Sequence, residues 1–344
     1  MEEHDEKHSS VIMSTIAKGD LVLVTGVSGF IASHTANQFL EAGYRVRGTV
    51  RSLEKADWLY KLFDEKYGKD KFEACVVPDM MAEDAFNEAV KGVAGICHMA
   101  SVMSFSDKPD EVIPIVVKSA LNALTAATKE PGMKSFVYTS SSTAALMPQP
   151  DKDIKITTDT WNDDVVHQAN TSPDPWSVYG ASKTEAERAI WKAVKETNPP
   201  FQVACILPNA NLGPILKPGG EHESSTASWV VKLYDGDESI LDTIPPQWFV
   251  NVQDTGRLHL IALIDPECNG QRIFAFAAPF TFNDVLAILR QLRPQKSFPG
   301  DREGLGKDLS QIPNEPAELW LKKHCGHGFT DLEETIKANI ATLD

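Results

Sequence analysis

The sequence predicts an α/β fold, in which a doubly wound parallel sheet carries a smaller C-terminal substrate-binding lobe. Three observations predict it. Short apolar runs alternate with amphipathic helical patterns through the first two thirds of the 344 residues, as in a parallel sheet covered by helices. A glycine-rich turn follows the first apolar run. Beyond Pro208, proline and glycine interrupt this alternation, and there we expect the lobe.

Each expected strand is an apolar run, and each expected helix repeats apolar residues every three to four positions. The apolar runs place strands at 21–24, 44–50, 72–77, 95–98, 135–139 and 202–207. The helical patterns between them place helices at about 31–42, 53–67, 84–91, 110–128 and 179–197. Beyond them we expect isolated helices near 226–234, 253–264, 282–292 and 331–341.

The glycine turn after the first strand reads Thr25-Gly26-Val27-Ser28-Gly29-Phe30-Ile31-Ala32. The first glycine permits a tight turn, and the second lets the backbone approach a pyrophosphate at a helix N-terminus. The spacing is G-x-x-G-x-x-A rather than G-x-G-x-x-G. We therefore expect a Rossmann-type dinucleotide site that includes Gly26, Ser28, Gly29, Phe30 and Ile31.

The residues at the end of the second strand indicate whether the site prefers NAD or NADP(H). A site for NAD places an acidic residue there for the ribose hydroxyls, whereas this strand ends in Arg51, with Lys55 one turn further on. A guanidinium binds a 2′-phosphate by bidentate hydrogen bonds. The sequence thus favours NADP(H), with Arg51 and Lys55 near the phosphate; the alternative is that both are only solvated.

Residues that follow other strands complete the expected cofactor site, because ligands of such sheets bind at the carboxyl ends of the strands. Asp79 and Met80 follow the third strand, Ala100 and Ser101 follow the fourth, and Thr139 ends the fifth.

A second motif, Tyr179-x-x-x-Lys183, places a phenol and an ammonium one helical turn apart on the same side. The positive charge stabilises the phenolate, so we expect the pKa of Tyr179 to fall from about 10 toward neutral. Such a phenol exchanges a proton with a carbonyl or an alcohol. A serine hydroxyl would orient the same oxygen, and the spacing alone leaves Ser140, Ser141 and Ser142 as candidates.

With these motifs the chain resembles the extended short-chain dehydrogenases/reductases, closest to the dihydroflavonol-reductase-like group that includes fungal NADPH-dependent aldehyde/ketone (carbonyl) reductases. Besides the two motifs, the resemblance rests on residues 98–101, 137–141, 207–209, 212–214 and 249–254. Two positions differ from the family pattern. Ala32 replaces a commoner glycine, and residues 142–144 replace a usual Ala-Gly-Thr.

The resemblance implies a role for each matching residue. Tyr179 is the expected proton donor, Lys183 the ligand of the nicotinamide ribose, and Ser141 the hydrogen-bond donor to the substrate carbonyl. Pro208 and Asn209 are expected to border the nicotinamide. The implied catalytic set is therefore Ser141, Tyr179 and Lys183.

The implied function is NADPH-dependent reduction of aldehydes and ketones to alcohols. The loops expected to flank the site are apolar and aromatic, without Arg or Lys for a phosphorylated substrate, so we expect a small hydrophobic carbonyl compound. The expected pocket residues are Val102, Phe105, Trp229, Ile244 and Gln247. Two alternatives stay open: a nucleotide-sugar epimerase or dehydratase of the same fold, and an NADP-binding redox sensor without turnover.

Composition argues against some classes of partner and indicates where in the cell we expect the protein. The net charge is −15, without an offsetting Lys/Arg cluster, which argues against nucleic-acid and anionic membrane partners. The five cysteines are scattered, as in a reduced cytoplasmic protein. The run His324-Cys325-Gly326-His327 lacks a fourth ligand, so we expect no metal. A monomer or a homodimer is expected.

We expect a flexible N-terminal extension at 1–19 and an NADP-binding Rossmann domain at 20–213. Residues 214–344 are expected to form mainly the C-terminal lobe, with 249–265 returning to the Rossmann domain.

Overall fold

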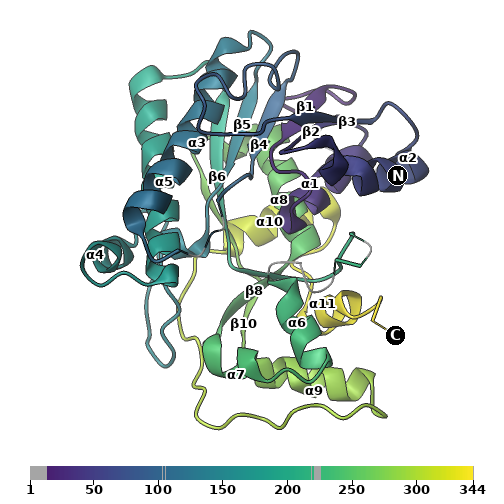
Figure 1. Ribbon diagram of the computed structural model, residues 1–344, viewed down its shortest axis with the longest axis vertical. Helices are drawn as coiled ribbons and strands as arrows, with labels where there is room; N and C mark the ends of the chain where they lie inside the picture. Colours follow the sequence, from purple (N-terminus) through teal and green to yellow (C-terminus); the bar gives the residue numbers. More distant parts are fainter. Residues whose placement is uncertain (1–13, 103, 105, 218, 221–225, 344) are drawn as a thin grey trace, which may run out of the picture.

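The computed structural model describes residues 14–102, 104, 106–217, 219–220 and 226–343. Two parts are visible, a larger one around a seven-stranded sheet and a smaller one around a three-stranded sheet (Figure 1). The predicted α/β class with a doubly wound parallel sheet is confirmed.

The strands of the large sheet are all parallel and lie in the order β3-β2-β1-β4-β5-β6-β9. The order reverses between β1 and β4, and this switch point is where such sheets open a crevice for a ligand. The strands are β1 (Leu21–Val24), β2 (Arg45–Val50), β3 (Phe72–Val76), β4 (Gly95–His98), β5 (Ser135–Thr139), β6 (Gln202–Pro208) and β9 (Arg272–Ala275).

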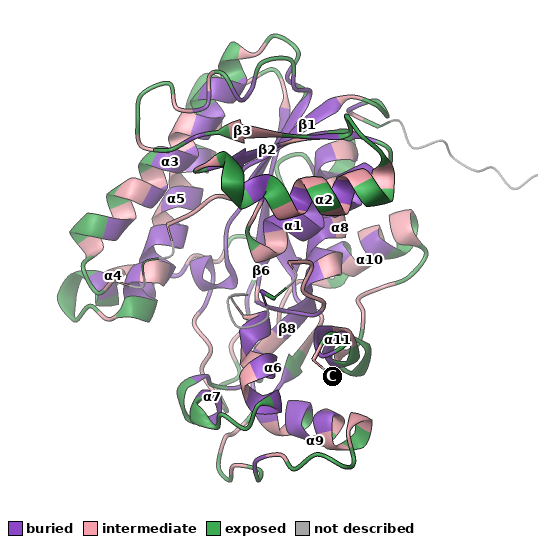
Figure 2. Cartoon of the chain, turned by 45° about the vertical axis from the view of Figure 1, so that its right-hand side comes forward, coloured by how far each residue is buried: buried purple, intermediate pink, exposed green. Residues whose placement is uncertain are grey.

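Helices cover both faces of this sheet, and alternate residues of β1 enter the two cores. Val22 and Val24 pack in the core with α1 (Phe30–Glu41), α2 (Asp57–Tyr67), α8 (Val252–Ile264) and α10 (Glu315–Cys325). Leu21 and Leu23 pack in the core with α3 (Pro109–Lys129) and α5 (Pro175–Thr197). Figure 2 shows exposed residues in green along the outer surface of α2, whereas α1 and α8 are mostly buried and purple.

Among the described residues, α3 is the one helix long and apolar enough to cross a membrane. It packs against α5, β4 and β5, and Val116, Ala120 and Leu124 are buried there. Its apolar composition is thus that of a core helix.

The smaller part is built on the strand order β10-β8-β7, with β7 (Ala210–Leu212), β8 (Gln247–Asn251) and β10 (Ala278–Phe280). Its core includes Leu233, Phe249, Leu286 and Ile336. The helices here are α6 (Ala227–Tyr234), α7 (Ser239–Thr243), α9 (Phe282–Leu292) and α11 (Leu332–Asn339).

The chain crosses between the two parts several times. β8 pairs with β7 and β10, and α8, which follows directly, packs on α1 and the large sheet. β9 and α10 also lie with the large sheet, although the sequence-based division placed them in the lobe. In our proposed division, both segments therefore belong to the larger part.

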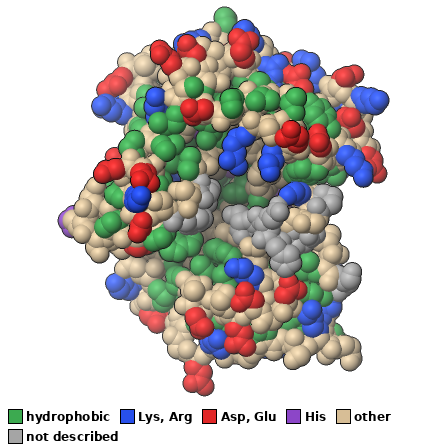
Figure 3. All heavy atoms as spheres, in the orientation of Figure 1, with side chains coloured by type: hydrophobic (Ala, Val, Ile, Leu, Met, Phe, Trp, Pro, Cys, Tyr) green, Lys and Arg blue, Asp and Glu red, His purple; other side chains and the backbone are tan. Residues whose placement is uncertain are grey.

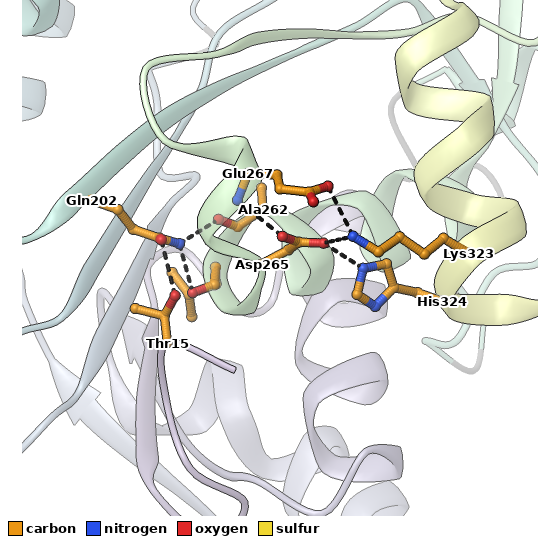
Figure 4. A network of polar contacts seen from close by, with 8 residues as sticks. Thr15, Gln202, Ala262, Asp265, Glu267, Lys323 and His324 are labelled. Carbon is orange, nitrogen blue, oxygen red and sulfur yellow. Dashed lines mark hydrogen bonds and ion pairs between the residues drawn. The ribbon is translucent and has the colours of Figure 1, made fainter. Parts of the chain in front are cut away.

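A polar network fastens these returning segments (Figure 4). Asp265, at the end of α8, accepts hydrogen bonds from Lys323 at 3.0 Å and contacts His324 at 2.8 Å, both on α10. Gln202 of β6 donates to the carbonyls of Ala262 and Leu263 on α8, at 3.0 Å each. Polar contacts thus attach α8 to β6 of the sheet and attach α10 to the end of α8.

Three local expectations differ from the structure. Residues 84–91 form successive turns instead of a helix, beginning at Asp84 with a φ of 62° that a right-handed helix does not allow. Residues 151–174, an acidic stretch for which we expected no helix or strand, contain α4 (Asp163–Thr171). The expected helix 53–67 is divided into the short 3₁₀ helix η1 (Leu53–Ala56) and α2.

Candidate active site

A cavity of about 1280 Å³ lies between the two parts, at the carboxyl ends of the large sheet's strands. Figure 3 shows the surface hollowed there, with Lys and Arg side chains on the rim of the larger part and hydrophobic side chains on the rim of the smaller part. The cavity is large enough for a dinucleotide and a small second ligand.

The glycine turn forms one wall of the cavity. Gly26 has a φ of 66°, and a Cβ added to it would lie 3.1 Å from the Cα and Cβ of Ala100. Gly29 is the N-cap residue of α1, whose first turn has neither a side-chain cap nor an acidic residue. The uncapped amides and the helix dipole favour an anion such as a pyrophosphate. Ser28, Phe30 and Ile31 also line this wall.

Arg51 and Lys55 line the cavity next to the glycine turn, together with Trp58. In the described part of the chain, neither cation forms a hydrogen bond or an ion pair with another residue, and both are exposed. Glu54 lies nearby, and its carboxylate accepts a hydrogen bond from Ser52 at 2.9 Å. The two cations are thus available to an anionic ligand group.

The ends of β1 and β4 are joined by one hydroxyl. Thr25 Oγ1 accepts hydrogen bonds from the amides of Met99 and Ala100, both at 2.9 Å, and contacts His98 Nδ1 at 3.1 Å. With two donors already bound, the hydroxyl donates to His98, whose pKa burial lowers to about 3. This neutral network holds the Ala100 backbone against Gly26.

The remaining predicted cofactor residues line the same cavity. The Ser101 hydroxyl is buried and has no hydrogen-bond partner among the described residues, so a ligand would satisfy it. The Asp79 carboxylate accepts from the Met81 amide at 2.8 Å, and the Met80 carbonyl accepts from Asn122 at 2.9 Å. The others are Thr139, Pro208 and Asn209.

Tyr179 and Lys183 both line the cavity from α5. The helix begins at Pro175, where Asp174 caps it through the amides of Trp176 and Ser177. Tyr179, expected at the helix start, therefore lies in its second turn. Lys183 is buried, and its ammonium donates to the Thr139 carbonyl at 3.2 Å.

The three candidate serines are separated by their partners. The Ser140 hydroxyl donates to the buried carboxylate of Glu187 at 2.7 Å, away from Tyr179. The Ser141 hydroxyl interacts with the Tyr179 phenol and accepts a hydrogen bond from Thr143 Oγ1 at 3.0 Å. Ser142 begins the short 3₁₀ helix η2 (Ser142–Ala144). Of the three, Ser141 is thus the serine that interacts with the phenol.

The pKa values here differ from the expectation. Burial raises the pKa of Tyr179 above its ordinary value, and the hydrogen bond from Ser141 opposes that rise. Burial lowers the pKa of Lys183 to about 8, and the Glu187 carboxylate opposes that fall. In the protein alone the phenol is thus not acidified by Lys183. It stays protonated at neutral pH, which suits a proton donor.

Val102, Trp229 and Gln247 line the end of the cavity next to the smaller part. Ile244 does not line it; its side chain packs instead in the core of the smaller part. Phe105 lies outside the described residues. The sequence analysis missed Ile215, Leu216 and Lys217, which follow β7 and also line the cavity. Gly213-Pro214 before them was the available signal for a loop.

Comparison with known proteins identifies the family. The model of the NAD dependent epimerase/dehydratase family matches residues 22–274. The chain belongs to this family.

Relatives within the family resemble the chain over nearly its whole length. Aldehyde reductase 2 of Sporidiobolus salmonicolor is 43% identical over 94% of this chain and 96% of that protein. Ketoreductase adrE of Penicillium rubens is 39% identical over 95% and 97%, respectively. The yeast methylglyoxal/isovaleraldehyde reductase Gre2, solved with NADPH, is 28% identical, with a TM-score of 0.81 over 93% and 97%. These likenesses confirm the resemblance to extended short-chain dehydrogenases/reductases.

Proposed function

We propose that the chain is an NADPH-dependent carbonyl reductase that converts small hydrophobic aldehydes and ketones into alcohols. One observation carries the proposal: the hydroxyls of Tyr179 and Ser141, which interact with each other, line the same cavity as the glycine turn and Arg51. The named activities of aldehyde reductase 2, ketoreductase adrE and Gre2 support it.

The residues present fit NADPH. The glycine turn brings the uncapped N-terminus of α1 to the cavity, where its free amides would bind a pyrophosphate. Arg51 and Lys55 would hold the 2′-phosphate, and the unsatisfied Ser101 hydroxyl would bind a polar group of the cofactor. Lys183 would hold the nicotinamide ribose. When bound, the cofactor supplies the hydride that reduces the carbonyl carbon.

The catalytic side chains supply the proton and stabilise the negative charge that develops on the carbonyl oxygen. Tyr179 donates its phenolic proton to the carbonyl oxygen as that oxygen gains negative charge. Ser141 donates a hydrogen bond to the same oxygen, and this bond strengthens as charge develops. The phenolate left on Tyr179 is stabilised by the Lys183 ammonium and is then reprotonated from water.

The end of the cavity next to the smaller part favours neutral, apolar substrates. Val102 and Trp229 provide apolar surface, and Gln247 provides an amide that can hydrogen-bond a substrate. Among the described residues after β7 that line the cavity, Lys217 is the one with a positive charge. A nucleotide sugar carries two phosphates, which a single cation would neutralise only in part. We therefore expect a small uncharged carbonyl compound to fit better. A monomeric or homodimeric cytoplasmic enzyme is part of the proposal.

The test follows reduced-nicotinamide absorbance with NADPH and NADH separately, against aldehydes, aryl ketones, ketoesters and flavanonols. The proposal expects consumption of NADPH with small carbonyl compounds and much slower consumption of NADH. Tight NADPH binding without consumption would favour a redox sensor. Interconversion of nucleotide sugars with retained NAD would favour an epimerase.

A further inference from the structure

A buried ion pair lies behind the proposed catalytic residues. Glu187 follows Lys183 by one turn of α5 and Tyr179 by two turns, so the three side chains share one side of the helix. The Glu187 side chain is fully buried. Arg272, the first residue of β9, donates from Nε to Oε1 at 2.7 Å and from Nη2 to Oε2 at 3.3 Å.

The same carboxylate holds the segment that carries Ser141. The Ser140 hydroxyl donates to Glu187 Oε2 at 2.7 Å, and the Ser140 amide donates to the Ile206 carbonyl of β6 at 2.8 Å. Ser140 is therefore fixed by both its side chain and its backbone. Because Ser141 is the next residue, its hydroxyl depends on that anchoring for its position beside Tyr179.

The negative charge of Glu187 also acts on Lys183. Burial lowers the pKa of Lys183 to about 8, and Glu187 opposes that fall. The other titratable groups around the carboxylate are Arg272 on β9, Cys205 on β6 and Tyr138 on β5. Burial raises the pKa of both the thiol and the phenol, so both are neutral. Arg272 is thus the charged partner of Glu187 on the side away from Lys183.

The attachment of β9 does not by itself explain why the Glu187 carboxylate is buried here. Arg272 Nη1 also donates to the carbonyls of Thr158 and Thr160, at 2.8 and 2.6 Å, and its guanidinium lies 4.0 Å from the Trp161 ring centroid. These contacts hold the strand without Glu187. A buried ion pair usually adds little net stability compared with apolar residues of similar size. Besides Arg272, the carboxylate accepts hydrogen bonds from Ser140 and Trp191 and raises the pKa of Lys183. Attachment of β9 requires none of these interactions.

We propose that Glu187, held by Arg272, is a positioning residue for catalysis: it anchors Ser141 through Ser140 and keeps Lys183 charged beside Tyr179. This inference rests on the proposed carbonyl reduction. Glu187 does not line the cavity, so it acts through its neighbours and not on the substrate.

The test compares pH profiles of kcat for NADPH-dependent carbonyl reduction in wild type, Glu187→Gln and Glu187→Asp. Removing the negative charge lowers the pKa of Lys183, so in Glu187→Gln the alkaline loss of activity moves to lower pH, by on the order of one unit. Glu187→Asp keeps the charge and keeps the wild-type profile. The matched control is Glu185→Gln, because Glu185 lies on the same helix and pairs with Arg188 near the surface.

NADPH binding, measured by fluorescence, shows which variants are folded independently of their activity. If Glu187→Gln does not bind NADPH, Glu187→Gln/Arg272→Gln is compared with Arg272→Gln instead, because these two variants differ only in the charge at position 187. A pH profile of the folded charge-removed variant that matches its reference, wild type or Arg272→Gln, overturns the inference, even if kcat falls. Wild-type protein that binds NADPH but reduces no carbonyl compound contradicts the proposed function instead.

Discussion

At the scale of single residues, the neighbours of a hydroxyl decide what it does. Ser140 and Ser141 are adjacent and chemically identical. The Ser140 hydroxyl nevertheless donates a hydrogen bond to Glu187, whereas the Ser141 hydroxyl interacts with the Tyr179 phenol. The sequence predicted a serine beside the tyrosine, and the resemblance selected Ser141. Spacing alone did not choose between them, because the choice depends on which side of β5 faces α5.

Replacing Ser141 with alanine removes the hydrogen bond to the developing negative charge on the substrate oxygen. We expect kcat to fall by about 10²–10³-fold, with the Kd of NADPH nearly unchanged, measured by steady-state kinetics and fluorescence titration. Ser140→Ala removes the side-chain anchor to Glu187 but keeps the Ser141 hydroxyl and the bond from the residue 140 amide to Ile206, so we expect a smaller loss of kcat. Equal losses would contradict the separate roles.

The pH dependence of the reaction follows from Lys183. Its pKa is lowered by burial to about 8, so the ammonium is present below that pH and is lost above it. In the proposed mechanism the ammonium stabilises the phenolate that Tyr179 becomes after it gives up its proton, so we expect kcat to fall as pH rises through about 8. The measurement is a kcat profile from about pH 6 to 10 at saturating NADPH, a range that spans the lowered pKa of Lys183 of about 8. A constant kcat across it would contradict this role.

At the scale of elements, the strands that alternate with helical patterns were predictable, and the strands beyond Pro208 were not. The first six strands of the large sheet and helices α1, α3 and α5 match their apolar patterns. β7, β8, β9 and β10 were missed because these segments of three to five residues lie where proline and glycine interrupt that alternation. Residues 84–91 have a helical pattern, but a left-handed Asp84 and the adjacent turns replace the helix.

The turn between β1 and α1 depends on Gly26. Alanine there adopts a positive φ at a cost of roughly 1–2 kcal/mol, and its Cβ lies 3.1 Å from Ala100. We expect Gly26→Ala to weaken NADPH binding by about tenfold or more through the displaced backbone, measured by titration. Gly43→Ala is the matched control, because Gly43 has a φ of 90° and nothing within 4 Å of an added Cβ. An equal loss of affinity in both variants would contradict the account.

At the scale of the whole molecule, the cavity requires both parts. The larger part supplies the proposed cofactor residues, and β7, β8 and α6 supply Asn211, Gln247 and Trp229. The residues that the sequence predicted for the cofactor line this cavity, because local motifs place them there; their role stays a prediction. The sequence placed only part of the substrate end, since Ile244 packs in a core and Leu216 was missed; those positions depend on packing between distant segments.

Cofactor binding is expected to stabilise the folded protein against unfolding. At a ligand concentration of 100 times Kd, binding stabilises the folded state by about 2.7 kcal/mol. We therefore expect NADPH to raise the Tm clearly more than NADH at equal concentration. Arg51→Ala is expected to abolish this difference by removing the 2′-phosphate ligand. A larger shift with NADH in wild type would contradict the cofactor preference, and differential scanning fluorimetry measures all cases.

The central claim is that the Tyr179 phenol delivers the proton to the carbonyl oxygen. The direct measurement is single-turnover reduction of a small aldehyde by NADPH in wild type and in Tyr179→Phe, with the Kd of NADPH measured for both. The account predicts that Tyr179→Phe binds NADPH with a nearly unchanged Kd and that its turnover falls by a factor of about 10²–10⁴ or more. Near-normal turnover in the phenylalanine variant would contradict it.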